Sequence, residues 1–269
     1  VITYYAQAIF IDGASNCKIY NNIMTKNVNS GVAEGNNAAN NLIYNNIFQD
    51  NPGAAINLTQ LSTSNTIYNN TMILNKVGIN LESSGNTIYW NIFIDNTNQV
   101  QFPGAPPSNT WHNGYPDGGN YWSNYVGEDL YRGPYQNETG SDGIFDTEHT
   151  VATNNIDKYP LVKPFSPHDI GIASFIKSKT IIAQGVLLRI DLKIVNYGLH
   201  NENFALTIDA NTITIVAETI TLSIRNSTTL TFTWNTMYVA RGIYTMKACA
   251  WPDLDEIDTV DNTHIDGIV

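Results

Sequence analysis

The residues of this chain whose types and spacing could do chemistry are three acids in one short stretch. Glu138, Asp142 and Asp146 recur every four residues, and Gly140 and Gly143 lie between them. Carboxylates on a glycine-containing loop can turn several oxygens onto one centre, and Ca²⁺ prefers such oxygen cages. The spacing falls short of the twelve-residue EF-hand loop. The sequence therefore offers a calcium site here, and the alternative is a loop of solvated acids held by Asx turns.

A second acidic stretch lies near the C-terminus. Its members are Asp253, Asp255, Glu256, Asp258 and Asp261. Such a run offers oxygen ligands for a second cation, and a solvated turn is the alternative interpretation.

The acids that precede Tyr115 lie apart in sequence: Asp12, Glu34, Asp50, Glu82 and Asp95. A polysaccharide hydrolase or lyase needs paired carboxylates, or an acid cluster that holds a cation beside a basic group. Stacking could bring Glu34 and Glu82 together, because they lie in comparable segments two turns apart. We predict no catalytic residues and expect a protein that is not an enzyme.

Asn-x-Ser/Thr triplets supply candidate glycosylation sites at Asn57, Asn69, Asn137 and Asn226. Such triplets arise by chance in a chain rich in Asn and Thr, and they are modified only in a secreted protein. Asn137 lies in a predicted loop, so we expect it to be modified first.

These residues must be positioned by a repeat that fills the N-terminal part of the chain. The phrase Ile-Tyr-x-Asn occurs at Ile19, Ile43, Ile67 and Ile88, at steps of 24, 24 and 21 residues. A fixed period in this range indicates a stacked repeat, and the alternation of Ile with Tyr is that of a strand. Strands that recur without helical crossovers predict a parallel β-helix.

Stacking of the repeats places equivalent residues of successive coils above one another. We predict an inner column of these isoleucines, an outer column of tyrosines and a ladder of asparagine amides at one corner. The tyrosines are Tyr20, Tyr44, Tyr68 and Tyr89, and the asparagines are Asn22, Asn46, Asn70 and Asn91.

Composition excludes several classes of function. Charged residues make up 14% of the 269 residues and the net charge is −11, so the chain lacks the Lys/Arg patch that releases counterions from nucleic acid. The sequence contains no stretch apolar and long enough for a transmembrane helix. It has no initial Met and no signal peptide, and we expect Val1 to be a processed or internal N-terminus.

Three motifs after the repeat carry a resemblance. They are Gly119-Asn-Tyr-Trp-Ser-Asn-Tyr125, Asp142-Gly-Ile-Phe-Asp146 and Asn155-Ile-Asp-Lys-Tyr-Pro-Leu161. In this order they resemble the end of NosD-like right-handed parallel β-helix domains of archaeal and bacterial surface proteins. The resemblance implies a calcium-like site at Glu138, Asp142 and Asp146, although Gly140 stands where the family has a further acid. Copper, from which the family takes its name, is not carried over, because Cys17, His112 and His149 lack ligand spacing.

A short joint at Lys163-Pro-Phe-Ser-Pro167 precedes a different pattern. About seven alternating strands are predicted at 170–174, 187–196, 204–209, 213–217, 220–224, 228–234 and 242–250, which is typical of an immunoglobulin-like sandwich. Val195-Asn-Tyr-Gly198, Trp234 and Asp258-Thr-Val-Asp-Asn262 are similar to those of the adhesion-related CARDB modules. The predicted fold is all-β: a parallel β-helix over 1–165, with a cap and acidic loop at 106–165, and a CARDB-like domain over 166–269.

Two hypotheses for function follow. The first is a structural or adhesive module of the extracellular cell surface, including the subunit of a filament or sheath. Self-association would use the unprotected first coil at Val1 and the C-terminal domain, and the alternative partner is a cell-surface glycan or protein. The second hypothesis is a protein that binds, or less plausibly cleaves, carbohydrate. Its tyrosine column and Trp90 would stack on sugar rings.

Overall fold

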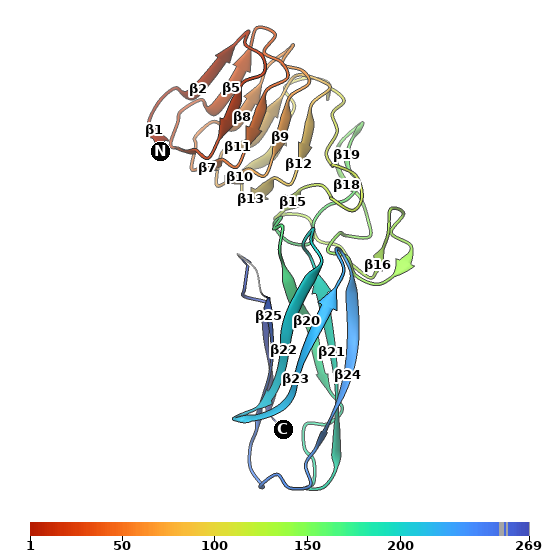
Figure 1. The fold of residues 1–269 in the computed structure, drawn as a ribbon. Helices are drawn as coiled ribbons and strands as arrows, with labels where there is room; N and C mark the ends of the chain where they lie inside the picture. The colour runs from red at the N-terminus through yellow and green to blue at the C-terminus, as the bar shows by residue number, and fades with distance from the viewer. Residues whose placement is uncertain (253–255, 257, 269) are drawn as a thin grey trace. The chain divides into compact units, whose positions relative to one another are not determined.

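The computed structural model describes residues 1–252, 256 and 258–268, and the regular structure of these residues consists of β-strands (Figure 1). The chain divides into two compact units. The first comprises Val1–Asp129 and Ile144–Phe165, and the second comprises Leu130–Gly143 and Ser166–Val269. A division thus falls at the predicted joint, and Leu130–Gly143 groups with the C-terminal unit.

The first unit is a parallel β-helix whose short strands build three sheets. One sheet contains β1 (Ile2–Thr3), β4 (Ile23–Thr25), β7 (Ile47–Gln49), β10 (Thr71–Ile73), β13 (Ile92–Ile94) and β15 (Tyr121–Trp122). The second contains β2 (Gln7–Asp12), β5 (Ser30–Gly35), β8 (Ala54–Leu58), β11 (Val77–Leu81) and β14 (Asn98–Gln101). The third contains β3 (Lys18–Tyr20), β6 (Leu42–Tyr44), β9 (Thr66–Tyr68) and β12 (Thr87–Tyr89).

The register of the third sheet confirms the predicted repeat. Ile19, Ile43, Ile67 and Ile88 are aligned in parallel strands and point inward, where each is at most 7% exposed.

The strand register also separates Glu34 from Glu82, the two acids that stacking could have paired. Glu34 is aligned with Leu58, and Leu58 is aligned with Leu81, so Glu82 lies one position further on and is half-buried. Stacking therefore does not bring these two acids together, because a shift of one residue along a strand turns a side chain to the other face.

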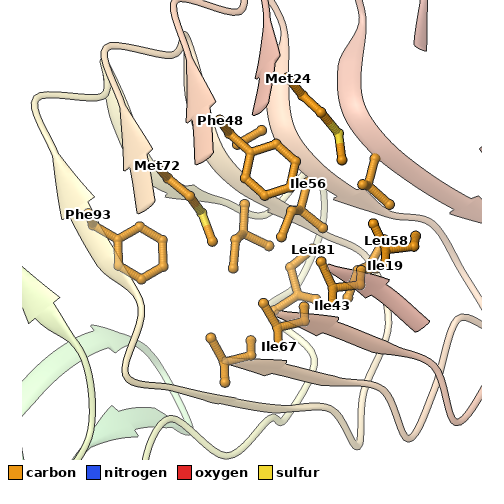
Figure 2. Close-up of a cluster of buried hydrophobic side chains, with 14 of the residues drawn as sticks. Ile19, Met24, Ile43, Phe48, Ile56, Leu58, Ile67, Met72, Leu81 and Phe93 are labelled. Atoms are coloured by element: carbon orange, nitrogen blue, oxygen red, sulfur yellow. The ribbon is translucent and has the colours of Figure 1, made fainter. Parts of the chain in front are cut away.

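The core alternates large and small side chains from one coil to the next. Met24, Phe48, Met72 and Phe93 form a fully buried column, which Figure 2 shows beside the isoleucines. Gly31 lies against the Phe48 ring, and a Cβ at residue 31 would come within 2.4 Å of it. Ala55, in the coil of Met72, has room for its methyl group and is fully buried. The glycine is therefore a packing residue that makes space for a ring.

Each corner of the β-helix combines a left-handed backbone with a buried asparagine. Asn21, Asn45, Asn69 and Trp90 have φ between 52 and 57°, and each directly precedes an asparagine of the predicted ladder. Asn tolerates this conformation better than most residues because its short side chain can bond locally. The repeated Asn-Asn pair thus has two roles, since the first residue turns the chain and the second bonds the next coil.

The predicted asparagine ladder is present. Asn70 is representative: its Nδ2 donates to Asn91 Oδ1 (2.9 Å), and its own Oδ1 accepts from Asn46 Nδ2 (3.0 Å). Two further ladders were not predicted. They run through Asn41, Asn65, Asn86, Asn109 and Asn155, and through Asn27, Asn51, Asn75, Asn96 and Gln99. All three corners of the coil are therefore hydrogen-bonded from turn to turn.

A cap closes the core after the last coil, as predicted. Trp122 of β15 is aligned with Phe93 and stacks on its ring at a centroid distance of 4.3 Å. The antiparallel pair β18 (His149–Ala152) and β19 (Asn155–Asp157) then ends two of the ladders. Asn155 accepts from Trp111 Nε1 (3.0 Å), and Asp157 accepts from Trp122 Nε1 (2.9 Å).

The second unit is a sandwich of two antiparallel sheets around a shared core. One sheet contains β20 (Ile170–Lys177), β21 (Leu187–Asn196) and β24 (Ser227–Asn235). The other contains β22 (Glu202–Ala210), β23 (Ile213–Leu222), β25 (Thr245–Pro252) and β26 (Thr263–Ile268). A short hairpin of β16 (Tyr131–Arg132) and β17 (Glu138–Thr139) belongs to the same unit.

Two predicted features of this unit were wrong. The segments 213–217 and 220–224 form the single strand β23, and β26 was not predicted. Both are edge strands, where polar side chains such as Glu218 face solvent and weaken the alternating pattern. Trp234 is a core residue as predicted, being 5% exposed.

Candidate functional site

The tyrosine column lies where it was predicted, but its rings stack on one another and leave little ring surface for a sugar. Tyr20, Tyr44, Tyr68 and Tyr89 stack with centroids 5.0 to 5.4 Å apart and ring planes within 8° of parallel. Neighbouring rings therefore cover one another's faces and present their edges to solvent. Trp90 is also engaged, because Phe165 stacks on it at 4.0 Å. This face is a continuous aromatic stack that stabilises the coil.

The three acids of the predicted calcium loop are distributed over both units. Glu138 is exposed on β17, and its Oε2 lies 3.7 Å from Arg132 Nε. Asp142 is fully buried in the second unit, where its Oδ2 accepts from Gln136 Nε2 (3.1 Å) and from the Gly133 amide (3.3 Å). Asp146 belongs to the first unit and is half-buried. A calcium site formed by these residues stays a prediction.

A different carboxylate cluster lies in the second unit. Ligand oxygens of Asp169, Glu256 and Asp261 lie within 4.8 Å of one another, and Asp169 is 1% exposed. Glu256 is held by the Ile170 amide (2.8 Å) and by Asn262 Nδ2 (2.8 Å). Only oxygen donors converge, which suits a hard divalent cation better than copper or zinc.

This cluster contains two members of the predicted second cation run. Asp253 and Asp255 of that run lie outside the described residues, and Asp258 accepts from the Val260 amide (3.2 Å) within the closing turn. Sequence reasoning missed Asp169, because it lies on the segment that enters β20 and is remote in sequence from the run. Backbone pairing supplies the link: the Ile172 amide donates to the Asp261 carbonyl (2.9 Å).

Two carboxyl groups are buried inside the β-helix. Glu34 takes a position that is aliphatic in the other coils, and burial raises its pKa from 4.5 to about 7. Its Oε1 accepts from Asn41 Nδ2 (3.2 Å), and such bonding lowers the pKa by less than burial raises it. Asp157, which ends the first ladder, is fully buried, and burial raises its pKa to about 7 against the opposing effect of four N–H donors. Both groups shed protons near neutral pH instead of near pH 4.

A polar groove lies at the end of the ladder that runs through Asn75 and Asn96, where Asn96 donates to Gln99 in place of a further asparagine. Its volume is about 530 Å³, and its lining includes Asp95, Asn98, Ser123 and His149. Ser123 Oγ accepts from the Asp95 amide (3.0 Å), which fixes the groove wall. Burial lowers the pKa of His149, so its imidazole is neutral at physiological pH. The groove can offer hydrogen bonds to a polar ligand and contains neither Lys nor Arg in its lining.

The candidate glycosylation sites differ in access. Asn137 is exposed, together with Thr139 of its triplet. The other three side chains are partly buried and bonded: Asn57 accepts from Asn80, Asn69 donates to Asn45, and Asn226 accepts from Arg132. The structure does not show whether any of the four sites is glycosylated. Asn137 stays the site that we expect to be glycosylated first.

Comparisons with known proteins match parts of the chain. Residues 2–127 match a family model, NosD, described as a periplasmic copper-binding protein. No curated protein matches the chain. Among solved structures, a CARDB domain from Pyrococcus furiosus in complex with di-metal ions is weakly similar. It is 17% identical with a TM-score of 0.35, and the match covers 39% of this chain and 89% of that one.

Copper does not fit the side chains of the β-helix. Within the described part of that unit, no three His, Cys, Asp or Glu side chains bring ligand atoms within 4.8 Å of one another. His112 Nδ1 accepts from the Gly114 amide (3.1 Å), and the His149 ring lies against Trp122 and Tyr125. The match to a periplasmic family is compatible with a location outside the cytoplasm. Among the residues that the structure describes, no helix is long and apolar enough to cross a membrane.

Proposed function

We propose that this chain is a non-enzymatic structural or adhesive module of an extracellular surface. The observation that carries the proposal is the continuity of the three amide ladders through the coils and into the cap. A ligand or catalytic site normally interrupts such repetition, whereas a structural β-helix is stabilised by it. The match of residues 2–127 to a periplasmic family is further support.

The proposal is tested by location and by activity together. Surface biotinylation of intact producing cells should label the protein. Purified protein should release no product from acidic or neutral polysaccharides. Steady product release that the Asp95→Ala variant abolishes would contradict the proposal. Electron microscopy of native material tests the finer suggestion that copies assemble into a filament or sheath, and dispersed single particles would contradict it.

We include calcium binding in this proposal, with two sets of oxygen ligands to compare. The convergence of Asp169, Glu256 and Asp261 within 4.8 Å supports a site in the sandwich. The predicted set Glu138, Asp142 and Asp146 is the alternative. Calcium at a hundredfold excess over Kd would stabilise the folded state by about 2.7 kcal/mol.

Calorimetry in Ca²⁺ and in EDTA gives the test. Asp261→Asn should remove the calcium-dependent rise in Tm if the cluster binds, and Glu138→Gln should remove it if the loop binds. Calcium binding would be contradicted if the Tm of the purified protein is unchanged on adding EDTA and is again unchanged on adding excess Ca²⁺.

Glycan binding is the second candidate, and the groove beside His149 favours it more than the tyrosine stack does. A neutral polyhydroxylated ligand suits a lining that combines amides, hydroxyls and Asp95 without a cation. Calorimetric titration with neutral oligosaccharides tests the idea. Asn98→Ala should weaken binding, and Tyr44→Ser, in the covered stack, serves as the matched control. Equal loss in both variants would contradict a site in the groove.

A further inference from the structure

Three loops gather at one end of the sandwich. They are residues 178–186 between β20 and β21, residues 211–212 between β22 and β23, and residues 236–244 between β24 and β25. Gln184 Nε2 donates to the Val239 carbonyl (2.9 Å), and Asn211 Nδ2 donates to the Ile243 carbonyl (2.9 Å). These bonds between loops make the end of the sandwich one surface, which we call the loop tip.

The loop tip projects large apolar side chains into solvent. Tyr238 is 92% exposed, Ile181 88%, Ile243 72% and Met237 56%. Isolated exposed apolar residues are ordinary, but several on joined loops form a patch that calls for a partner.

The charge of the loop tip is opposite to that of the chain. Its loops carry Lys179 and Arg241 and contain no Asp or Glu, although acids outnumber bases by 24 to 13 in the whole sequence. Of the nearby acids on the strands, Asp266 pairs with Lys177 (3.4 Å), and Asp209 accepts from the neutral Thr214 Oγ1 (2.7 Å), which leaves its charge in place. The positive charge of the loop tip is therefore a local feature.

We propose that the loop tip binds the surface of an anionic lipid bilayer, with Ile181 and Tyr238 inserted at the level of the headgroups. Apolar side chains flanked by cations are the combination that binds such an interface. A Tyr ring suits this position because its body is apolar and its hydroxyl stays in water. A protein partner fits less well, because a specific interface buries about 800 Å² on each side and needs a broader face than four side chains on loops.

This binding would hold the sandwich at a membrane surface without a spanning segment, and it is independent of the proposed structural role. Each cation near an anionic surface contributes about fivefold to the partition coefficient. Removal of a buried apolar side chain the size of Ile costs about tenfold or more. Both effects can be measured separately.

Co-sedimentation of the full chain with vesicles tests the proposal. The protein should bind vesicles of phosphatidylcholine with 25% phosphatidylserine and bind pure phosphatidylcholine weakly. Ile181→Ser and Tyr238→Ser should each lower binding about tenfold, and Lys179→Ala combined with Arg241→Ala should remove the preference for anionic lipid. Tyr135→Ser alters an equally exposed ring (84%) outside the loop tip and should change nothing.

A Tyr238→Trp variant supplies a direct readout of insertion. Its fluorescence should shift to the blue on anionic vesicles. Absence of binding to the anionic vesicles would overturn the proposal. Binding that depends on Lys179 and Arg241 but is indifferent to Ile181→Ser and Tyr238→Ser would also overturn it, since the contact would then be electrostatic adsorption. The same holds if soluble polyglutamate binds as tightly as the vesicles, which would indicate an acidic protein partner.

Discussion

Glu34→Gln should change how the stability of the β-helix depends on pH. The Glu34 side chain is fully buried in a column that continues as Leu58 and Leu81, and burial raises its pKa from 4.5 to about 7. The unfolded chain loses this proton near pH 4.5, whereas the folded protein keeps it until about pH 7. Stability from this group is therefore fully present below pH 4.5, falls as the pH rises to about 7, and is constant above that value.

The magnitude follows from the two pKa values. Each pKa unit corresponds to about 1.4 kcal/mol, so ionisation of Glu34 lowers the free energy of unfolding by about 3 kcal/mol between pH 4.5 and pH 7. Glu34→Gln keeps an amide oxygen for Asn41 and removes the titrating group. We expect the variant to be as stable as the parent at pH 4.5 and about 3 kcal/mol more stable at pH 8. Asp157 titrates in the same range and should account for the dependence that remains.

Hydrogen exchange at several pH values is the suitable assay, because peptides from 42–58 report on the β-helix and exclude the sandwich. Parent and variant are compared at each pH, so that the intrinsic pH dependence of exchange cancels. Glu82→Gln changes a half-buried acid that directly follows β11 of the same sheet, and it is the matched control. Equal protection in parent and Glu34→Gln at pH 8 would refute the reasoning, since it would mean that the buried carboxylate is ionised at no cost.

Three other substitutions test the packing, the ladders and the corners by equilibrium unfolding in denaturant. Gly31→Ala should cost about 1 to 3 kcal/mol, because the new Cβ would meet the Phe48 ring at 2.4 Å; a neutral result would mean that the ring shifts freely. Asn70→Ala should cost about 3 to 5 kcal/mol, because it leaves buried donors and carbonyls without partners, and Asn22→Ala at the exposed end of the same ladder should cost less. Equal costs would show that the ladder is not cooperative. Leu74→Asn should stabilise by about 0.5 to 1 kcal/mol, because Leu74 is 52% exposed at φ 56°; a loss of stability would contradict the account of the corners.

The sequence was sufficient to predict the coil because each repeat restates the same local rules. Ile19 and its equivalents alternate with tyrosines, and equal spacing forces like residues into register. The ladders at the other two corners were missed for a different reason. In those columns Asn27 and Asn41 are followed by less regular neighbours, so the amides are visible only when the coils are aligned in three dimensions.

The candidate sites were less accessible to sequence reasoning, because they depend on contacts between remote segments. Nothing local to Asp169 indicates that it meets Glu256 and Asp261, and only the pairing of β20 with the segment before β26 reveals this. The acidic loop is a different case, because its regular spacing predicts one centre from local sequence alone. The structure adds contacts that the spacing did not indicate: Glu138 lies beside Arg132, and Asp142 accepts hydrogen bonds from Gly133 and Gln136.

The hydrogen bonds at the end of the β-helix explain why a ligand site is expected outside the repeated coils. Along the coils each ladder asparagine donates a hydrogen bond to the equivalent asparagine of the next coil. A substitution at one of these positions would therefore break the ladder. At the cap the acceptors change to Asp157, Asn155 and Gln99, and it is beside Gln99 that the polar groove opens. Chemistry in a protein of this kind is therefore expected where a ladder ends. A search for ligands should begin at the groove in the first unit and at the loop tip in the second, since the asparagines and tyrosines of the stacked coils are engaged with one another.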